Sequence, residues 1–131
     1  TNGGKVTVMK FNGSSWVYVG TPGFSIALAE TPSLAIDGSG TPYVAYRDTG
    51  NGYKATVKKF DGTNWIDVGI PGLSASYAQY TSLDIDGLGV PFIAYQDSGN
   101  GYKATVKKFN GSFFHVQRCF TYGISQVAII M

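Results

Sequence analysis

The feature that most constrains this chain is a repeat of 49 residues. Phe11, Phe60 and Phe109 each end a similar segment, KVTVMKF or KATVKKF, and their spacings are 60 − 11 = 49 and 109 − 60 = 49. Residues 51–60 and 100–109 are the same string, NGYKATVKKF. A fixed period of this length is typical of solenoids and propellers, in which each repeat buries its apolar face against its neighbours.

Each period predicts four strands, which in the first complete copy span residues 33–37, 42–47, 53–60 and 65–69. Three of the connections are short and rich in Asp, Asn and Gly, which supply the positive φ angles that hairpin turns need. The fourth connection, residues 70–81, is long and starts with Pro-Gly. Three hairpins and one crossover predict an all-β chain whose antiparallel four-stranded sheets are β-propeller blades.

The segment SLAIDGSGTPYVAYRDTGNGYKATVKKFDGTNWIDVG, residues 33–69, resembles the blades of NHL-type and related bacterial propellers. Blades of that type combine an apolar strand ending in Asp-Gly, an aromatic-valine strand, a longer third strand and a fourth strand that ends in glycine. The resemblance covers residues 1 to about 118. It implies a propeller layout and carries over no particular function.

The phase of the repeat predicts an incomplete ring. Residues 1–20 form a half blade, residues 33–69 and 82–118 form two blades, and residues 119–131 form a divergent tail strand. The chain holds 131/49, about 2.7, blades, whereas propellers usually close with 4 to 8. We therefore expect homo-oligomerisation, with a dimeric five- or six-bladed ring favoured over a three-chain ring of eight blades. A fragment of a longer propeller is the other interpretation.

The tail is expected to supply a strand. Residues 127–131 are apolar and nearly uncharged, and residues 126–131 are expected to form one strand, the first strand of a further blade. In a ring of several chains, this strand would complete the half blade at the start of another chain.

Composition excludes several classes of protein. The net charge of +2 is small, and the lysines recur with the repeat instead of forming one patch, so no nucleic acid is expected. No apolar run has membrane-spanning length. His115 and Cys119 are the only residues of their kinds and are too few to hold a metal ion. The DGSG and DGLG segments at Asp37 and Asp86 lack the spacing of a calcium loop and are interpreted as turns.

The near-identity of the copies argues against catalysis. An active site generally needs a distinct nucleophile, base and orienting group, whereas here the polar groups occur in matched pairs. We therefore expect no enzyme and no cofactor, but a binding module with a glycan or protein ligand. A pure assembly scaffold and a piece of a larger secreted propeller enzyme are the alternatives.

A candidate binding surface lies where the second strand of each copy ends. The loop after that strand and the long crossover are expected to open on the same face, because both follow strands that run in one direction. Asx turns at the two aspartates are the structural alternative to a binding role. Phe24 is expected to add an exposed ring. The predicted ligand-binding residues are Arg47, Asp48, Asn51, Tyr53, Gln96, Asp97, Asn100, Tyr102, Tyr77 and Tyr80, with Lys54 and Lys103 beside them.

Two further positions recur with the repeat. Trp16, Trp65 and Phe114 occupy one position, which predicts packing between neighbouring blades. The Lys-Lys pairs at 58–59 and 107–108 do not form a basic patch within a blade, since strand neighbours point to opposite faces. They are expected to lie at solvated edges.

Overall fold

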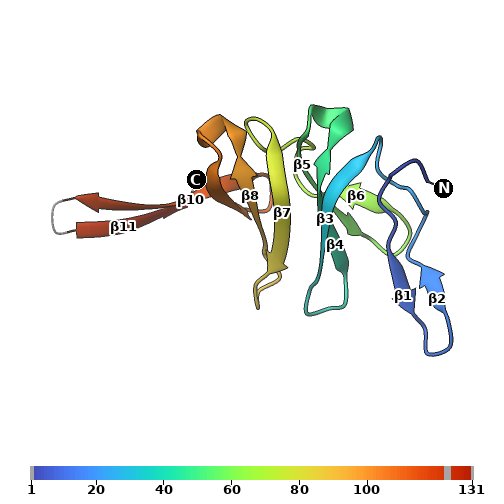
Figure 1. Cartoon of the computed structure of the whole chain (residues 1–131). Helices are drawn as coiled ribbons and strands as arrows, with labels where there is room; N and C mark the ends of the chain where they lie inside the picture. The colour runs from blue at the N-terminus through green and yellow to red at the C-terminus, as the bar shows by residue number, and fades with distance from the viewer. Residues whose placement is uncertain (1, 123–124, 131) are drawn as a thin grey trace.

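The chain folds into three antiparallel sheets, none of which is closed (Figure 1). The computed structural model describes the backbone of residues 2–122 and 125–130 and the side chains of residues 2–117. The first sheet is the hairpin of β1 (Met9–Phe11) and β2 (Trp16–Tyr18). The second contains, in this order, β3 (Ala29–Ile36), β4 (Pro42–Asp48), β5 (Lys54–Phe60) and β6 (Trp65–Asp67). The third contains β7 (Ala78–Ile85), β8 (Pro91–Asp97), β9 (Lys103–Phe109), β10 (Phe114–Tyr122) and β11 (Ser125–Ile130).

The second and third sheets share their strand register. Ala29 pairs with Asp48 in the second sheet, and Ala78 pairs with Asp97 in the third, each number being raised by 49. The first strands of both sheets start four residues before the predicted positions 33 and 82, because a bulge carries the pairing across an irregular stretch. The predicted connection 70–81 is therefore wrong over its last four residues, which lie in β7.

The loops after β4 and β8 are single turns of 3₁₀ helix, η1 (Thr49–Asn51) and η2 (Ser98–Asn100). Each turn ends at a glycine in the left-handed conformation, Gly52 with φ 67° and Gly101 with φ 64°. Only glycine adopts this conformation without steric cost, which is why the Asn-Gly pair of the sequence indicated a turn here. Within the described residues no helix is long and apolar enough to cross a membrane.

Strand β4 of the second sheet is buried on both of its faces. Along β4, Tyr43 and Ala45 belong to the core shared with the third sheet, whereas Val44 and Tyr46 belong to the core shared with the first. This alternation follows from the two-residue period of a strand, which sends neighbouring side chains to opposite faces. The continuous apolar run in β4 is thus the signature of a sheet placed between two others.

Aromatic side chains link each sheet to the preceding one. The indole Nε1 of Trp65 donates a hydrogen bond of 2.8 Å to the carbonyl of Val19, and the Trp65 ring covers Gly20. Phe114 lies over Gly69 in the same way. The predicted packing role is therefore confirmed for these two aromatics. Trp16 occupies the same position in the first sheet and is 66% exposed, because no other sheet of the described residues packs on it.

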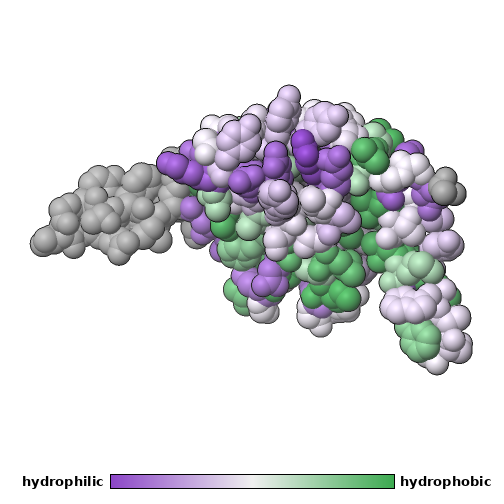
Figure 2. All heavy atoms as spheres, in the orientation of Figure 1, coloured by the Kyte–Doolittle hydropathy of each residue, from purple (hydrophilic) through white to green (hydrophobic). Residues whose placement is uncertain are grey.

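Strands β3 and β7 lie side by side at the front of the molecule (Figure 1). The backbone N–H of Leu83 donates to the Ser33 hydroxyl at 3.0 Å, and the Thr81 hydroxyl donates to the Thr31 carbonyl. Figure 2 shows hydrophilic residues across the upper middle of this face and hydrophobic residues below them. Leu34 and Ile36 of β3 are exposed hydrophobic residues.

The tail pairs within its own chain. β10 continues to Tyr122 and pairs with β11, so that Gln117 lies opposite Ile130 and Tyr122 opposite Ser125. This hairpin projects from the rest of the molecule (Figure 1). The expectation that the tail starts a new sheet is therefore wrong for its described residues, because β11 extends the third sheet at its outer edge. Met131, the last residue of the predicted strand, lies outside the described part of the chain.

The contact between Gly20 and the second sheet gives a stability test. A Cβ atom on Gly20 would lie 2.8 Å from Phe60 and 3.0 Å from Trp65, at a φ of 71°. We expect Gly20→Ala to lower the free energy of unfolding by at least about 2 kcal/mol. Gly40→Ala is the control, because its φ is 87° with open space around it, and it should cost only about 1 kcal/mol. Urea unfolding followed by tryptophan fluorescence measures both, and equal losses would contradict the contact.

Candidate functional site

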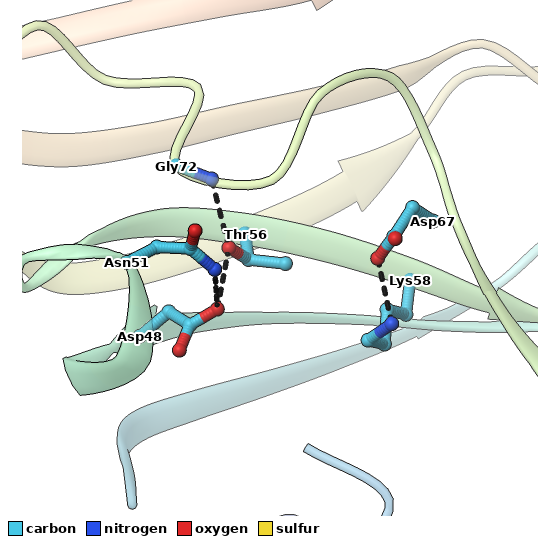
Figure 3. A network of polar contacts seen from close by, with 6 residues as sticks. All are labelled: Asp48, Asn51, Thr56, Lys58, Asp67 and Gly72. Atoms are coloured by element: carbon cyan, nitrogen blue, oxygen red, sulfur yellow. Dashed lines mark hydrogen bonds and ion pairs between the residues drawn. The ribbon is translucent and has the colours of Figure 1, made fainter. Parts of the chain in front are cut away.

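The loop after β4 is organised by a buried carboxylate. Asp48 is 1% exposed and accepts hydrogen bonds from the Gly50 N–H at 3.0 Å, the Asn51 side-chain amide at 2.7 Å and the Thr56 hydroxyl at 2.9 Å (Figure 3). The carboxylate thus caps η1 and ties it to β5. A buried charge is stable only when such donors surround it.

The loop after β8 has the same device with one contact fewer. Asp97 is 7% exposed and accepts from the Gly99 N–H and the Thr105 hydroxyl, both at 3.0 Å. Asn100, the counterpart of Asn51, is exposed. Asp48 and Asp97 therefore hold their loops from inside, as the Asx-turn interpretation requires, and neither carboxylate points at solvent.

Tyr53 and Tyr102 follow these loops in a conformation that is uncommon for residues with a side chain. Their φ angles are 62° and 61°, in the left-handed region. Such a conformation costs free energy and persists only where the surroundings hold it. Here the N–H of each tyrosine donates to the carbonyl of the aspartate that caps the loop, at 2.9 Å for Tyr53 and 2.8 Å for Tyr102. Both rings remain exposed.

Four of the side chains around the first loop form one cluster. The Arg47 guanidinium lies 4.7 Å from the centre of the Tyr53 ring, and it pairs with Glu30 at 2.9 Å. Tyr77 meets Tyr53 edge to face, with the ring centres 5.8 Å apart and an interplanar angle of 72°. The crossover and the loop therefore lie on the same face, as predicted. We call Glu30, Arg47, Tyr53 and Tyr77 the tyrosine cluster.

The second copy of this surface is built differently. Gln79 and Gln96 pair across β7 and β8 where Glu30 and Arg47 pair across β3 and β4, so a neutral pair replaces the ion pair. Tyr102 is exposed beside them. The predicted binding residues thus fall into one compact cluster and one looser copy.

The crossover aromatics Tyr80 and Phe24 differ in exposure. Tyr80 lies in the bulge of β7 with a φ of 52° and is 71% exposed, as predicted. Phe24 was expected to be exposed, and this prediction is wrong. Its ring stacks on Trp65 with the centres 4.3 Å apart and an interplanar angle of 8°, and it is partly buried against the core between the first and second sheets.

Two lysines of the Lys-Lys pairs, Lys58 and Lys107, make contacts that the sequence did not predict. Lys58 is buried and forms an ion pair of 2.6 Å with Asp67 on the neighbouring strand (Figure 3). Lys107 donates to the Leu73 carbonyl at 2.7 Å, and burial lowers its pKa. The prediction of solvated lysines is therefore wrong at these two positions. The residue paired across the strands could have indicated the ion pair. Lys58 faces Asp67, whereas Met9, the equivalent of Lys58, faces Tyr18.

The Asp-Gly turns are held by their own aspartates. Asp37 accepts from the Ser39 hydroxyl at 2.7 Å and from the backbone N–H groups of Ser39 and Thr41, both at 2.9 Å. The hydroxyl contact is the main cause that lowers the pKa of Asp37. The described residues contain no group of three or more His, Cys, Asp or Glu side chains that could hold a metal ion. The Cys119 side chain lies outside the described part.

Comparisons with protein-family models, with curated proteins and with solved structures find no match to this chain.

The buried tyrosine beside Asp48 gives a test by pH. Burial raises the pKa of Tyr46 above its ordinary value of 10.0, and the Asp48 carboxylate adds to this shift. Near pH 10 the phenol ionises in the unfolded chain, whereas in the folded chain it keeps its proton. The free energy of unfolding therefore has its full value below pH 10 and falls as the pH rises above it. Tyr46→Phe removes this proton, and we expect its unfolding free energy to fall less between roughly pH 9 and 11.

The measurement is urea unfolding at a series of pH values. Tyr95→Phe is the matched variant, because burial raises the pKa of Tyr95 as well and the residue occupies the same position in the third sheet. Alkaline slopes that equal that of the wild type in both variants would contradict the assignment.

Proposed function

We propose that this chain is a non-catalytic β-propeller unit that assembles head to tail with further copies of itself. Each of its three sheets corresponds to a blade or part of one, as the resemblance to NHL-type blades implies. A dimer that forms a five- or six-bladed ring is the favoured assembly, and a three-chain ring of eight blades is the alternative.

One observation carries this proposal. The face of the second sheet that meets the third sheet includes Ala45, Ala55 and Val57, which are all almost fully buried. The same strand sequence in the third sheet presents Ala104 and Val106 on the corresponding face, and both are exposed. The surface with which the second sheet packs on the third is thus repeated on the third sheet, where these two residues are exposed.

The opposite end carries the complementary surface. Phe60 and Trp65 of the second sheet pack on the first sheet, over Gly20. Their equivalents Phe11 and Trp16 are 56% and 66% exposed, next to the exposed Met9. Exposed apolar surface of this kind marks an interaction site. A second copy that places its β1–β2 hairpin on the third sheet would cover both surfaces by repeating the internal contact.

The arrangement of polar groups supports a role without catalysis. The two carboxylates that cap the loops after β4 and β8, Asp48 and Asp97, are buried in equivalent positions and hydrogen-bonded within their own sheets. Equivalent groups suit equivalent contacts better than the distinct roles of an active site. A pure assembly scaffold and a piece of a larger secreted propeller enzyme are the other functions consistent with this pattern.

Light scattering of the folded wild-type chain should give the mass of a discrete oligomer. Trp16→Asp and Val106→Asp place a charge on either end surface, and we expect each to shift the mass to that of one chain, because a buried unpaired charge is costly. Leu88→Asp is the control, since Leu88 is 90% exposed in the turn between β7 and β8. A folded monomer of the wild type would overturn the proposal.

A second candidate function is the binding of a glycan or protein ligand by the tyrosine cluster. The observation that favours it is the meeting of Tyr53, Tyr77 and Arg47 on one exposed face. Exposed aromatic rings beside a cation and hydrogen-bonding groups suit sugar rings and peptides.

A glycan array tests this second candidate. We expect saturable binding of at least one glycan class, weakened roughly tenfold by Tyr77→Ala and retained by Tyr77→Phe, which keeps the ring. Binding that is equally strong in Tyr77→Ala would exclude the cluster as the site.

A further inference from the structure

The crossovers that leave the first and second sheets bind to those sheets through the same contacts. In both, a Pro-Gly-x-Ser segment lies along the start of the third strand of its own sheet, as TPGFS in residues 21–25 and IPGLS in residues 70–74. The N–H of Leu73 donates to the Ala55 carbonyl at 2.7 Å. The Gly72 N–H donates to the Thr56 hydroxyl at 3.0 Å (Figure 3).

The serine of the segment completes the contact. The Ser74 hydroxyl accepts from the Ala55 N–H at 3.0 Å and donates to the Ser76 carbonyl at 2.6 Å. In the first crossover, Ser25 accepts from the Val6 N–H at 3.1 Å and donates to the Ala27 carbonyl at 2.8 Å. The segment therefore satisfies both backbone groups of one residue of the third strand and the hydroxyl of the next, as an added strand would.

Glycine is required in this segment by conformation and by space. Gly23 and Gly72 have φ angles of 68° and 70°. A Cβ atom on Gly72 would lie 3.3 Å from the Cβ of Asn51, and one on Gly23 would lie 3.1 Å from the Cβ of Asn2. Both the close approach and the left-handed backbone exclude a larger residue.

The third sheet has the same groove, but the described residues of its own chain do not fill it. We call Asn100, Lys103, Ala104 and Thr105, the equivalents of residues 51 and 54–56, the third groove. Positions 120 and 121, which correspond to Pro71 and Gly72, belong to β10 and pair with β11 instead of crossing to β9. Ala55 is fully buried between its crossover and the third sheet, whereas Ala104 is exposed.

A cavity of about 640 Å³ marks this place. Its lining includes Asp97, Asn100, Ala104 and Thr105, together with Ala75 at the end of the second crossover. By the register of Ala55 opposite Arg47, Ala104 opposite Gln96 presents its N–H and C=O to the cavity and not to β8. The Thr105 hydroxyl donates to Asp97 and keeps its acceptor capacity, as Thr56 does.

We infer that the third groove is a binding site for a peptide segment of the form Pro-Gly-(Phe or Leu)-Ser supplied by another chain. The two internal copies define the ligand. The glycine N–H binds the Thr105 hydroxyl, the next N–H binds the Ala104 carbonyl, and the serine hydroxyl accepts from the Ala104 N–H. This inference goes beyond the proposed assembly, because it needs only the groove of a single chain.

The test uses the full chain and a labelled peptide with the sequence of residues 69–77, GIPGLSASY. We expect saturable binding in fluorescence anisotropy. The same peptide with Ser74→Ala should bind roughly three- to tenfold more weakly, and the peptide with Gly72→Ala should not bind.

A matched pair of protein variants locates the peptide. Thr105→Val should weaken binding roughly three- to tenfold, whereas Thr56→Val, which removes the same hydroxyl from a groove that is already filled, should leave it unchanged. No binding to the wild type, equal effects of the two variants, or no effect of Thr105→Val would overturn the inference. Light scattering of the same samples separates the two proposals. A monomer that binds the peptide would contradict the proposed assembly only, and an oligomer that does not bind the peptide would contradict the peptide site only.

Discussion

The structure depends on the packing of sheets face to face. Strand β4 shows this most clearly, since Ala45 packs toward the third sheet while Tyr46 packs toward the first, and both are fully buried. A single sheet of this size cannot bury its apolar residues alone. Within the described residues, the second sheet has a neighbour on either face, whereas the first and third each have one.

Polar contacts at the ends of the strands hold the loop after β4 and the second crossover to β5. Asp48 ties the loop after β4 to β5, and the Gly72 N–H ties the crossover to the same Thr56 hydroxyl. These contacts are internal, so the surface left for a ligand consists of the residues that the loops turn outward, chiefly Tyr53 and Tyr77. The strained φ of Tyr53 is held by the same loop, through the hydrogen bond from its N–H to the backbone carbonyl of Asp48.

Local patterns made part of the fold and of the site predictable. Gly52 and Gly101 marked the turns, and the alternation in the KATVKKF segment marked β5 and β9. Predictions failed where a distant partner decides. Lys58 is buried with Asp67 as its partner across the strand pair, and Phe24 is partly buried because Trp65 stacks on it. The start of β7 at Ala78 depends on a bulge that no local residue pattern indicated.

The sequence by itself determined the all-β class, the turns and the aromatic positions at which Trp65 and Phe114 pack, because these follow from side-chain period and backbone conformation within one repeat. Only the tertiary structure decided which equivalent positions are covered. Ala55 and Ala104 stand in the same string, yet Ala55 is buried between a crossover and the third sheet, while Ala104 is exposed. At Ala104, β10 continues into a hairpin with β11, and no further sheet among the described residues covers the third. Burial is a property of neighbours, and identical segments differ only in what lies beside them.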